Sequence, residues 1–154
     1  MLIADTDFLS SFLKIDRLEL VKDFFREDIY VPVAVQREIA KTDLIIKLNE
    51  KKFVHVVNVK RKDMAGSEFL GEGEIECLSL ATENDLVLMN DRVAGRIGES
   101  NKIKVVNIPG FLLVLRESGF LDKSELKKTV KDLKERDFYL LSKKDEEEIT
   151  GEKG

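Results

Sequence analysis

The sequence predicts an α/β protein with a five-stranded, mainly parallel sheet and helices on both faces of that sheet. Short apolar, β-branched runs alternate with stretches whose apolar residues recur at helical spacing, which is the pattern of strand–helix–strand units. The run Leu86-Val87-Leu88-Met89 is apolar throughout, as expected for a strand that is buried on both faces. With 154 residues, 43% of them hydrophobic, the chain is long enough for one packed domain.

Five short segments have the composition of strands. They are residues 2–4, 29–31, 53–59, 86–89 and 103–106. Because connections between parallel strands are right-handed, the strands can run outward from the first strand in one direction and then resume on its other side. The first and fourth strands are then neighbours. The crevice at their carboxyl ends is where open α/β sheets bind ligands.

Helical spacing and capping residues predict the helices between these strands. Helices are expected at residues 8–15, 16–25, 33–41, 44–51, 71–82, 92–97, 109–118 and 126–138, with single turns near 67–70 and 142–145. Asp16 is expected to cap the second helix, and Asp122 with Glu125 resembles a capping box before the last long helix.

Composition and charge exclude several classes of protein. Cys77 is the single cysteine, which rules out an intrachain disulfide framework, and the lone His55 argues against a histidine-rich metal site. No apolar run reaches the roughly 20 residues that span a bilayer. Asp5 interrupts the first apolar run, so no signal peptide is predicted and a cytoplasmic location is expected. The net charge of -4 means that a nucleic-acid partner would need a local basic patch or a metal ion.

Acidic residues converge on the predicted crevice. The candidates are Asp5, Glu38, Glu74 and Asp91, with Asp7 and Glu72 close by. The first and last of the four end neighbouring strands, and the two glutamates lie on helices that follow a strand or a loop. Several carboxylates in one cleft repel one another unless a cation is present, and Mg²⁺ or Mn²⁺ suits such oxygen ligands. A metal ion of this kind can polarise a phosphodiester and help to generate hydroxide from water.

Simpler interpretations exist for each of these residues. Since the chain carries 30 acidic residues, any single one is also explained as a helix cap or a surface charge; their joint placement favours a functional site. Arg92 and Arg96 follow Asp91 and could reach RNA phosphates, with solvated surface charges as the alternative. The basic run Lys60-Arg61-Lys62 is interpreted as a solvated loop, with the rim of an RNA site as the alternative.

Four motifs resemble those of the PIN-domain ribonucleases, including the VapC-type toxins of toxin–antitoxin pairs. They are Leu2-Ile3-Ala4-Asp5-Thr6-Asp7, Val31-Pro32-Val33-Ala34-Val35-Gln36-Arg37-Glu38, Gly71-Glu72-Gly73-Glu74-Ile75-Glu76 and Leu86-Val87-Leu88-Met89-Asn90-Asp91. They occur in the order found in that family and cover roughly residues 1–121. The Gly-Glu-x-Glu third motif and the C-terminal helices resemble one PIN subgroup.

The resemblance implies a three-layer α/β/α sandwich and Mg²⁺- or Mn²⁺-dependent cleavage of single-stranded RNA by activated water. It carries the acidic roles onto Asp5, Glu38, Glu74 and Asp91, of which Asp5, Glu74 and Asp91 are the expected metal ligands, and a supporting role onto Thr6 or Asp7. From their positions beside these acids, Glu72 and Asn90 are expected to support the site as well, and Arg92 and Arg96 are the candidates for RNA contacts. The expected domains are a PIN-like nuclease domain at 1–121, a helical extension packed on it at 122–150, and a disordered tail at 151–154. A homodimer and an antitoxin protein are the expected protein partners.

The sequence departs from the family pattern at two points. Asp7 stands where Ser or Asn is commoner, and the third acid is Glu rather than the Asp of many VapC toxins. Glu72 could share or replace the role of Glu74. Residues i and i+2 do not share a helix face, so only one of the two is expected to face the other acids.

Two other functions fit parts of the sequence. Asp5-Thr6-Asp7 after an apolar strand resembles the Asp-x-Asp motif of haloacid-dehalogenase-type phosphatases, in which the first Asp is the nucleophile. Phe8 follows in place of the Gly-Thr that this motif expects. The second alternative is a PIN fold without catalysis that serves as an RNA- or protein-binding module, and metal binding distinguishes it from a nuclease.

Overall fold

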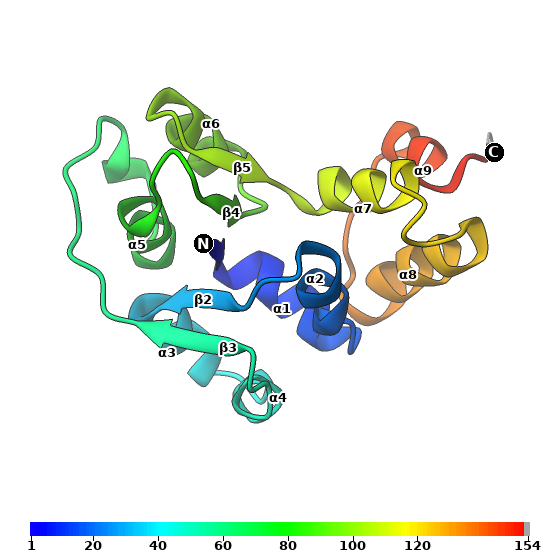
Figure 1. Cartoon of the computed structure of the whole chain (residues 1–154), viewed down its shortest axis with the longest axis horizontal. Helices are drawn as coiled ribbons and strands as arrows, with labels where there is room; N and C mark the ends of the chain where they lie inside the picture. Colours follow the sequence, from blue (N-terminus) through cyan, green and yellow to red (C-terminus); the bar gives the residue numbers. More distant parts are fainter. Residues whose placement is uncertain (153–154) are drawn as a thin grey trace.

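The computed structural model describes residues 1–152, in which a five-stranded sheet is surrounded by nine α-helices (Figure 1). The strands are β1 (Leu2–Ala4), β2 (Ile29–Pro32), β3 (Val54–Val57), β4 (Leu86–Leu88) and β5 (Lys104–Val106). Their order is β3-β2-β1-β4-β5 and every pairing is parallel. The predicted fold class is therefore confirmed, as is the placement of the fourth strand beside the first.

The helices fall where apolar spacing and caps predict them. They are α1 (Thr6–Lys14), α2 (Leu18–Phe25), α3 (Val33–Ala40), α4 (Leu44–Asn49), the 3₁₀ helix η1 (Ser67–Phe69), α5 (Glu72–Leu80), α6 (Arg92–Ser100), α7 (Ile108–Glu117), α8 (Lys123–Arg136) and α9 (Lys143–Thr150). Asp91, Asn107, Asp122 and Ser142 each cap a helix by accepting a hydrogen bond from the backbone N–H three residues later. No helix among residues 1–152 is long and apolar enough to cross a membrane.

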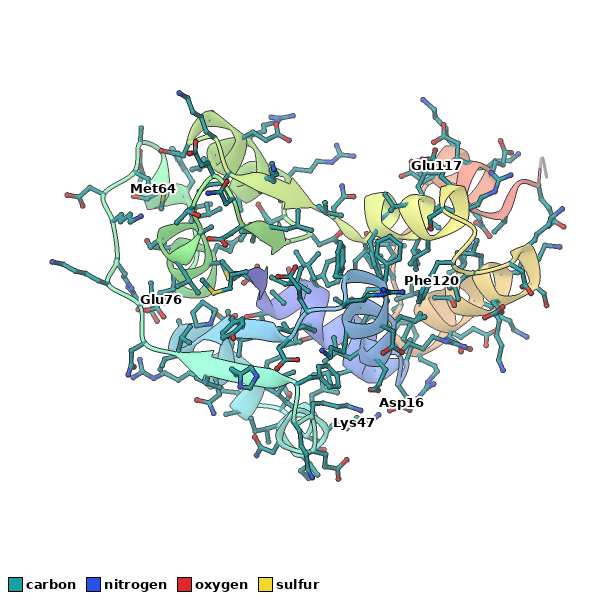
Figure 2. The ribbon with its side chains drawn as sticks, viewed as in Figure 1. Asp16, Lys47, Met64, Glu76, Glu117 and Phe120 are labelled. Atoms are coloured by element: carbon teal, nitrogen blue, oxygen red, sulfur yellow. The ribbon has the colours of Figure 1, made fainter. Side chains whose placement is uncertain are left out.

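Two local predictions were wrong. Asp16 does not cap α2, because the helix begins at Leu18 and Asp16 has a positive φ of 56°. Its carboxylate instead pairs with Lys47 and with Arg136, each at 2.8 Å, and Figure 2 shows Asp16 and Lys47 near one another. The single turn expected after Ser142 is an eight-residue helix, α9.

The core is built on β1 and on an aromatic cluster. All three residues of β1 are fully buried, as the central position of this strand in the sheet requires. Phe12 of α1 and Phe111 of α7 meet edge to face at 5.5 Å between ring centroids, and Phe25 of α2 stacks on Phe111 at 5.7 Å. Packing of these rings holds α1, the helix that follows Asp5, in a defined position.

The C-terminal helices pack on the rest of the protein. Figure 1 shows α7, α8 and α9 (yellow to red) together at one end of the molecule. The apolar face of α8 is buried through Leu126, Val130 and Leu133. The hydroxyl of Ser11 in α1 donates to Asp137, just after α8, at 2.6 Å. Of the tail predicted to be disordered, residues 153–154 lie outside the described residues.

Candidate active site

The carboxyl ends of β1 and β4 meet at one edge of the sheet, where the strand order reverses. Asp5 directly follows β1, and Asp91 follows β4 by three residues. The backbone N–H of Asp5 donates to the carbonyl of Leu88 at 2.9 Å, which holds Asp5 against the end of β4. The ends of these two neighbouring strands therefore lie side by side, and each strand is followed by an aspartate.

Asp5 is the most deeply buried of the candidate acids. Its exposed fraction is 3%, and among the described residues its Oδ1 atom has no hydrogen-bond partner. The pKa of Asp5 is raised from 3.8 to about 7, chiefly by burial and in smaller part by the carboxylates of Glu74, Asp7 and Glu38, while the backbone amide of Thr6 offsets part of this rise. A buried carboxylate without a donor is costly unless it is protonated or bound to a cation.

Glu38 and Asp5 converge on Gly73, near the start of α5. The N–H of Gly73 donates to Glu38 Oε1 at 3.3 Å. A Cβ atom at Gly73 would lie 2.9 Å from Glu38 Oε1, a distance that real Cβ atoms essentially never show, and 3.2 Å from Asp5 Oδ1, which is tighter than most real contacts. Sequence reasoning missed Gly73 as a site residue, although its position between two candidate acids in Gly-Glu-Gly-Glu is a signal.

Glu72 and Glu74, both in the first turn of α5, have different surroundings. Desolvation raises the pKa of Glu74, and the carboxylates of Asp91, Asp7 and Glu38 raise it further; a hydrogen bond from the Gly71 N–H at 2.9 Å lowers it. Glu72 is exposed and lies 3.6 Å from a guanidinium nitrogen of Arg61, so it is directed elsewhere. Glu74, and not Glu72, therefore lies among the other acids.

Asp91 and Asn90 have different surroundings at the end of β4. Asp91 is exposed and caps α6, since its Oδ1 accepts the N–H of Ala94 at 2.9 Å. Asn90 Oδ1 accepts from the N–H of Ile108 at 3.1 Å and from the hydroxyl of Tyr139 at 3.0 Å. Asn90 thus connects β4 to α7 and to the segment after α8. Tyr139 was not foreseen, because this contact joins residues 49 positions apart in the chain.

Thr6 and Asp7 begin α1 beside the acids. Thr6 Oγ1 is buried and, like Asp5 Oδ1, has no hydrogen-bond partner among the described residues. Partial desolvation and then the carboxylates of Glu38 and Asp91 raise the pKa of Asp7, whose side chain is nonetheless open to solvent. Both residues therefore adjoin the cleft, and Asp7 adds to its negative charge.

The acids near Asp5 offer oxygen donors only, the type of ligand that Mg²⁺ and Mn²⁺ prefer. Among residues 1–152, no group of three or more His, Cys, Asp or Glu side chains is placed so that it could hold a metal ion. Asp5 Oδ1 is nevertheless buried without a partner, and both it and Glu38 Oε1 lie next to Gly73, which has no side chain to fill the space. The structure therefore brings two carboxylate oxygens, one from Asp5 and one from Glu38, to a point where a cation would balance their charge.

A second buried acid, Glu76, connects the two helices that carry the glutamates. Its Oε1 accepts the N–H of Ala34 at the start of α3 at 3.0 Å, and its Oε2 accepts Arg61 Nε at 3.0 Å. Figure 2 shows Glu76 beside the extended segment that links β3 to α5. Arg61 is thus part of an ion pair and not a free loop cation. Sequence reasoning missed this role of Glu76, although a charge next to the buried Cys77 is a signal.

Replacing Glu76 with Ala is expected to lower the free energy of unfolding by about 2 kcal/mol. The backbone N–H of Ala34 would lose its acceptor in a buried position, and Arg61 would lose its buried partner. Glu72→Ala is the matched control, because it removes the exposed acid that lies near the same arginine and should cost less than about 0.5 kcal/mol. Urea unfolding measures both changes, and equal stability of the two variants would contradict the prediction.

The parallel sheet and the buried Asp5 carboxylate, with Glu38 and Glu74 near it, define an α/β protein with clustered acids at the carboxyl end of its central strand. A family profile described as a PIN domain matches residues 1–150, and the chain belongs to this family. PIN domains are generally nucleases, and they generally use divalent metal ions. The match also includes the C-terminal helices. No match was found among curated proteins or among solved structures.

Proposed function

We propose that the protein is a Mg²⁺- or Mn²⁺-dependent endoribonuclease that cleaves single-stranded RNA by activated water. The observation that carries the proposal is the buried Asp5 carboxylate, which has an oxygen without a partner and faces Glu38 and Glu74 at the switch point of the sheet. Such a carboxylate suits a site that is completed by a cation and a phosphodiester.

Each acid has a distinct part in the proposed reaction. Asp5, Glu74 and Asp91 supply oxygen ligands from three different elements. When bound, the metal ion supplies Lewis-acid polarisation of the phosphodiester and lowers the pKa of water. Glu38, held at the cleft by the Gly73 N–H, orients the attacking water and accepts its proton. The oxygen of water bonds to phosphorus as the bond to the leaving oxygen breaks, which yields one phosphomonoester and one hydroxyl end.

The two glutamates at the start of α5 provide the test. Purified wild type is expected to cut single-stranded RNA with Mn²⁺ or Mg²⁺ and to be inactive in EDTA. Glu74→Gln is expected to lower kcat by about 100-fold or more. Glu72→Gln, the same change two residues earlier in the chain, is expected to leave kcat close to the wild-type value. Thermal stabilisation by Mn²⁺ should be present in wild type and reduced in Glu74→Gln. Equal cleavage by both variants would indicate a contaminating nuclease.

A wild type that shows neither RNA cleavage nor thermal stabilisation by Mn²⁺ would support the alternative of a non-catalytic PIN-fold binding module. Membership of the PIN family favours a nuclease over the phosphatase interpretation of Asp5-Thr6-Asp7. A phosphatase would need Asp7 as general acid or base, so Asp7→Asn separates those two activities.

The proposal extends to the role of a cytoplasmic toxin of the VapC type that forms a homodimer and is held by an antitoxin protein. Phe69, Phe138 and Leu140 have exposed fractions of 75%, 82% and 94%, which supplies apolar surface for a protein partner. The mass in solution, measured by light scattering, tests the dimer. Growth arrest on expression, relieved by Glu74→Gln, tests the toxin role.

A further inference from the structure

A groove of about 520 Å³ begins at Asp91 and continues between α6 and α7. Arg92, Gly95 and Arg96 of α6 line one wall, and Val114 of α7 lines the other. Its volume lies within the roughly 300–1,000 Å³ of small-ligand sites. Asp91, one of the four acids of the proposed site, therefore lines one end of this groove.

Two arginines that have no ion-pair partner among the described residues line this groove, together with the acids Asp91 and Glu99. Arg92 and Arg96 are four residues apart, so they lie on the same face of α6, and both are exposed. None of the salt bridges within residues 1–152 includes either guanidinium. Glu99 lies further along the same helix and also lines the groove. Since the chain has a net charge of -4, binding of RNA depends on such a local patch.

The lining of the groove is apolar away from the arginines. Met89, Val105 and Val106 contribute to it, and Val114 has an exposed fraction of 41%. Gly95 keeps the space open, because a Cβ atom there would meet only Val105 Cγ1, at 3.9 Å. Beside these apolar side chains, two guanidinium groups that are unpaired within the described part of the chain are complementary to a nucleotide, which has a phosphate at one end and a flat base at the other.

We propose that this groove is a subsite for one nucleotide of single-stranded RNA, the nucleotide next to the phosphodiester that is cut. Arg92 and Arg96 bind its phosphate, and the apolar lining beside Gly95 receives its base. The inference rests on the proposed ribonuclease function and assigns that function a substrate-binding surface outside the four acids.

The first experiment measures binding without cleavage. A fluorescein-labelled single-stranded RNA of ten nucleotides is titrated with the Asp5→Asn protein in EDTA, and anisotropy gives Kd at several salt concentrations. Adding Arg92→Gln and Arg96→Gln is expected to weaken binding by about tenfold and to reduce the salt dependence of log Kd by about 1. Arg26→Gln with Lys52→Gln is the matched control, because it removes two exposed positive charges that precede β2 and β3 and do not line the groove.

The second experiment fills the groove without changing its charge. Gly95→Leu places a side chain where a Cβ atom fits, and it is expected to weaken RNA binding by about tenfold while thermal unfolding shows an intact fold. Gly95→Ala should have a smaller effect. In the cleavage-competent protein, the arginine variants and Gly95→Leu are expected to raise KM about tenfold with little change in kcat.

The outcomes separate this inference from the proposed catalysis. A wild type that binds RNA through the two arginines but never cleaves it would support the subsite and overturn the catalytic proposal. A wild type that cleaves RNA, with unchanged Kd and KM in the arginine variants and in Gly95→Leu, would overturn the subsite alone. An equal loss of affinity in the Arg26/Lys52 control would also overturn it, because the effect would then come from net charge.

Discussion

Asp5→Asn is expected to abolish RNA cleavage and, without metal, to make the protein more stable at neutral pH. Loss of the carboxylate removes an oxygen ligand at the centre of the cleft, so we expect activity to fall by about 1,000-fold or more. The same change removes a buried negative charge that faces Glu38 and Glu74. We expect the free energy of unfolding in EDTA at pH 8 to rise by about 2 kcal/mol.

The pH dependence of stability follows from the direction of this pKa shift. Folding raises the pKa of Asp5 from 3.8 to about 7, so the folded protein holds a proton that the unfolded chain has released. The stability that this proton contributes is fully present below pH 4 and is lost as the pH rises to about 7. The shift corresponds to at most about 4 kcal/mol. Metal-free wild type should therefore become less stable from pH 5 to pH 8, and Asp5→Asn should flatten that slope.

Asp85 provides the matched control, because it is a second buried aspartate with satisfied oxygens. It accepts hydrogen bonds from the Met1 ammonium at 2.7 Å and from the Thr82 N–H at 2.8 Å. Desolvation acts to raise the pKa of Asp85, but these hydrogen bonds lower it overall, so its contribution to stability is lost only as the pH falls below about 4. Asp85→Asn should destabilise the protein at pH 8. Thermal unfolding in EDTA that shows Asp5→Asn to be equally destabilising would refute the assignment of Asp5.

Gly73→Ala is expected to lower cleavage by about 100-fold without unfolding the protein. The new Cβ atom would lie 2.9 Å from Glu38 Oε1, so the Glu38 carboxylate must move from its place next to Asp5. Because that atom is the end of a flexible side chain, the fold can accommodate the change. Alanine also favours the helix by about 1 kcal/mol relative to glycine. We therefore expect weaker stabilisation by Mn²⁺ and lower kcat, with thermal stability in EDTA unchanged or higher.

Gly98→Ala gives the opposite result and is the control for Gly73→Ala. A Cβ atom at Gly98 would lie 2.8 Å from Val105 and 3.1 Å from Leu78, both side chains that pack against the sheet. Overpacking of this kind costs about 1–3 kcal/mol, while the acids are untouched. Measurement of unfolding and cleavage on both variants distinguishes the two cases. Wild-type cleavage by Gly73→Ala would show that Glu38 does not need its present position.

The fold class and the parallel direction of the strands were predicted from the sequence alone, and the strand order was one of the arrangements that the sequence allowed. The spacing of apolar residues along each segment indicates whether that segment is a strand or a helix, and it can be read without knowing the contacts of the segment. Right-handed connections then leave few ways to arrange five such strands. For the same reason, Asp5 and Asp91 could be placed together, since residues that end neighbouring parallel strands share one edge of the sheet. The prediction that Asp16 caps α2 was wrong because its carboxylate forms ion pairs with Lys47 and Arg136, which are distant in the chain and which a local capping signal does not reveal.

Only the tertiary structure decided which acids face one another. Glu72 and Glu74 are both glutamates of one motif, and the sequence does not show which of them faces the other acids. In the structure Glu72 lies beside Arg61, whereas Glu74 lies near Asp91, Asp7 and Glu38. The closeness of Gly73 to Asp5 and Glu38 requires α3, α5 and β1 to pack together. Burial and the lack of a hydrogen-bond donor at Asp5 likewise depend on surrounding residues from across the chain. The sequence by itself determined at which strand ends carboxylates could meet. Long-range packing determined how deeply each carboxylate is buried and which charges lie near it, because desolvation and charge repulsion depend on the distances between residues that are far apart in the chain.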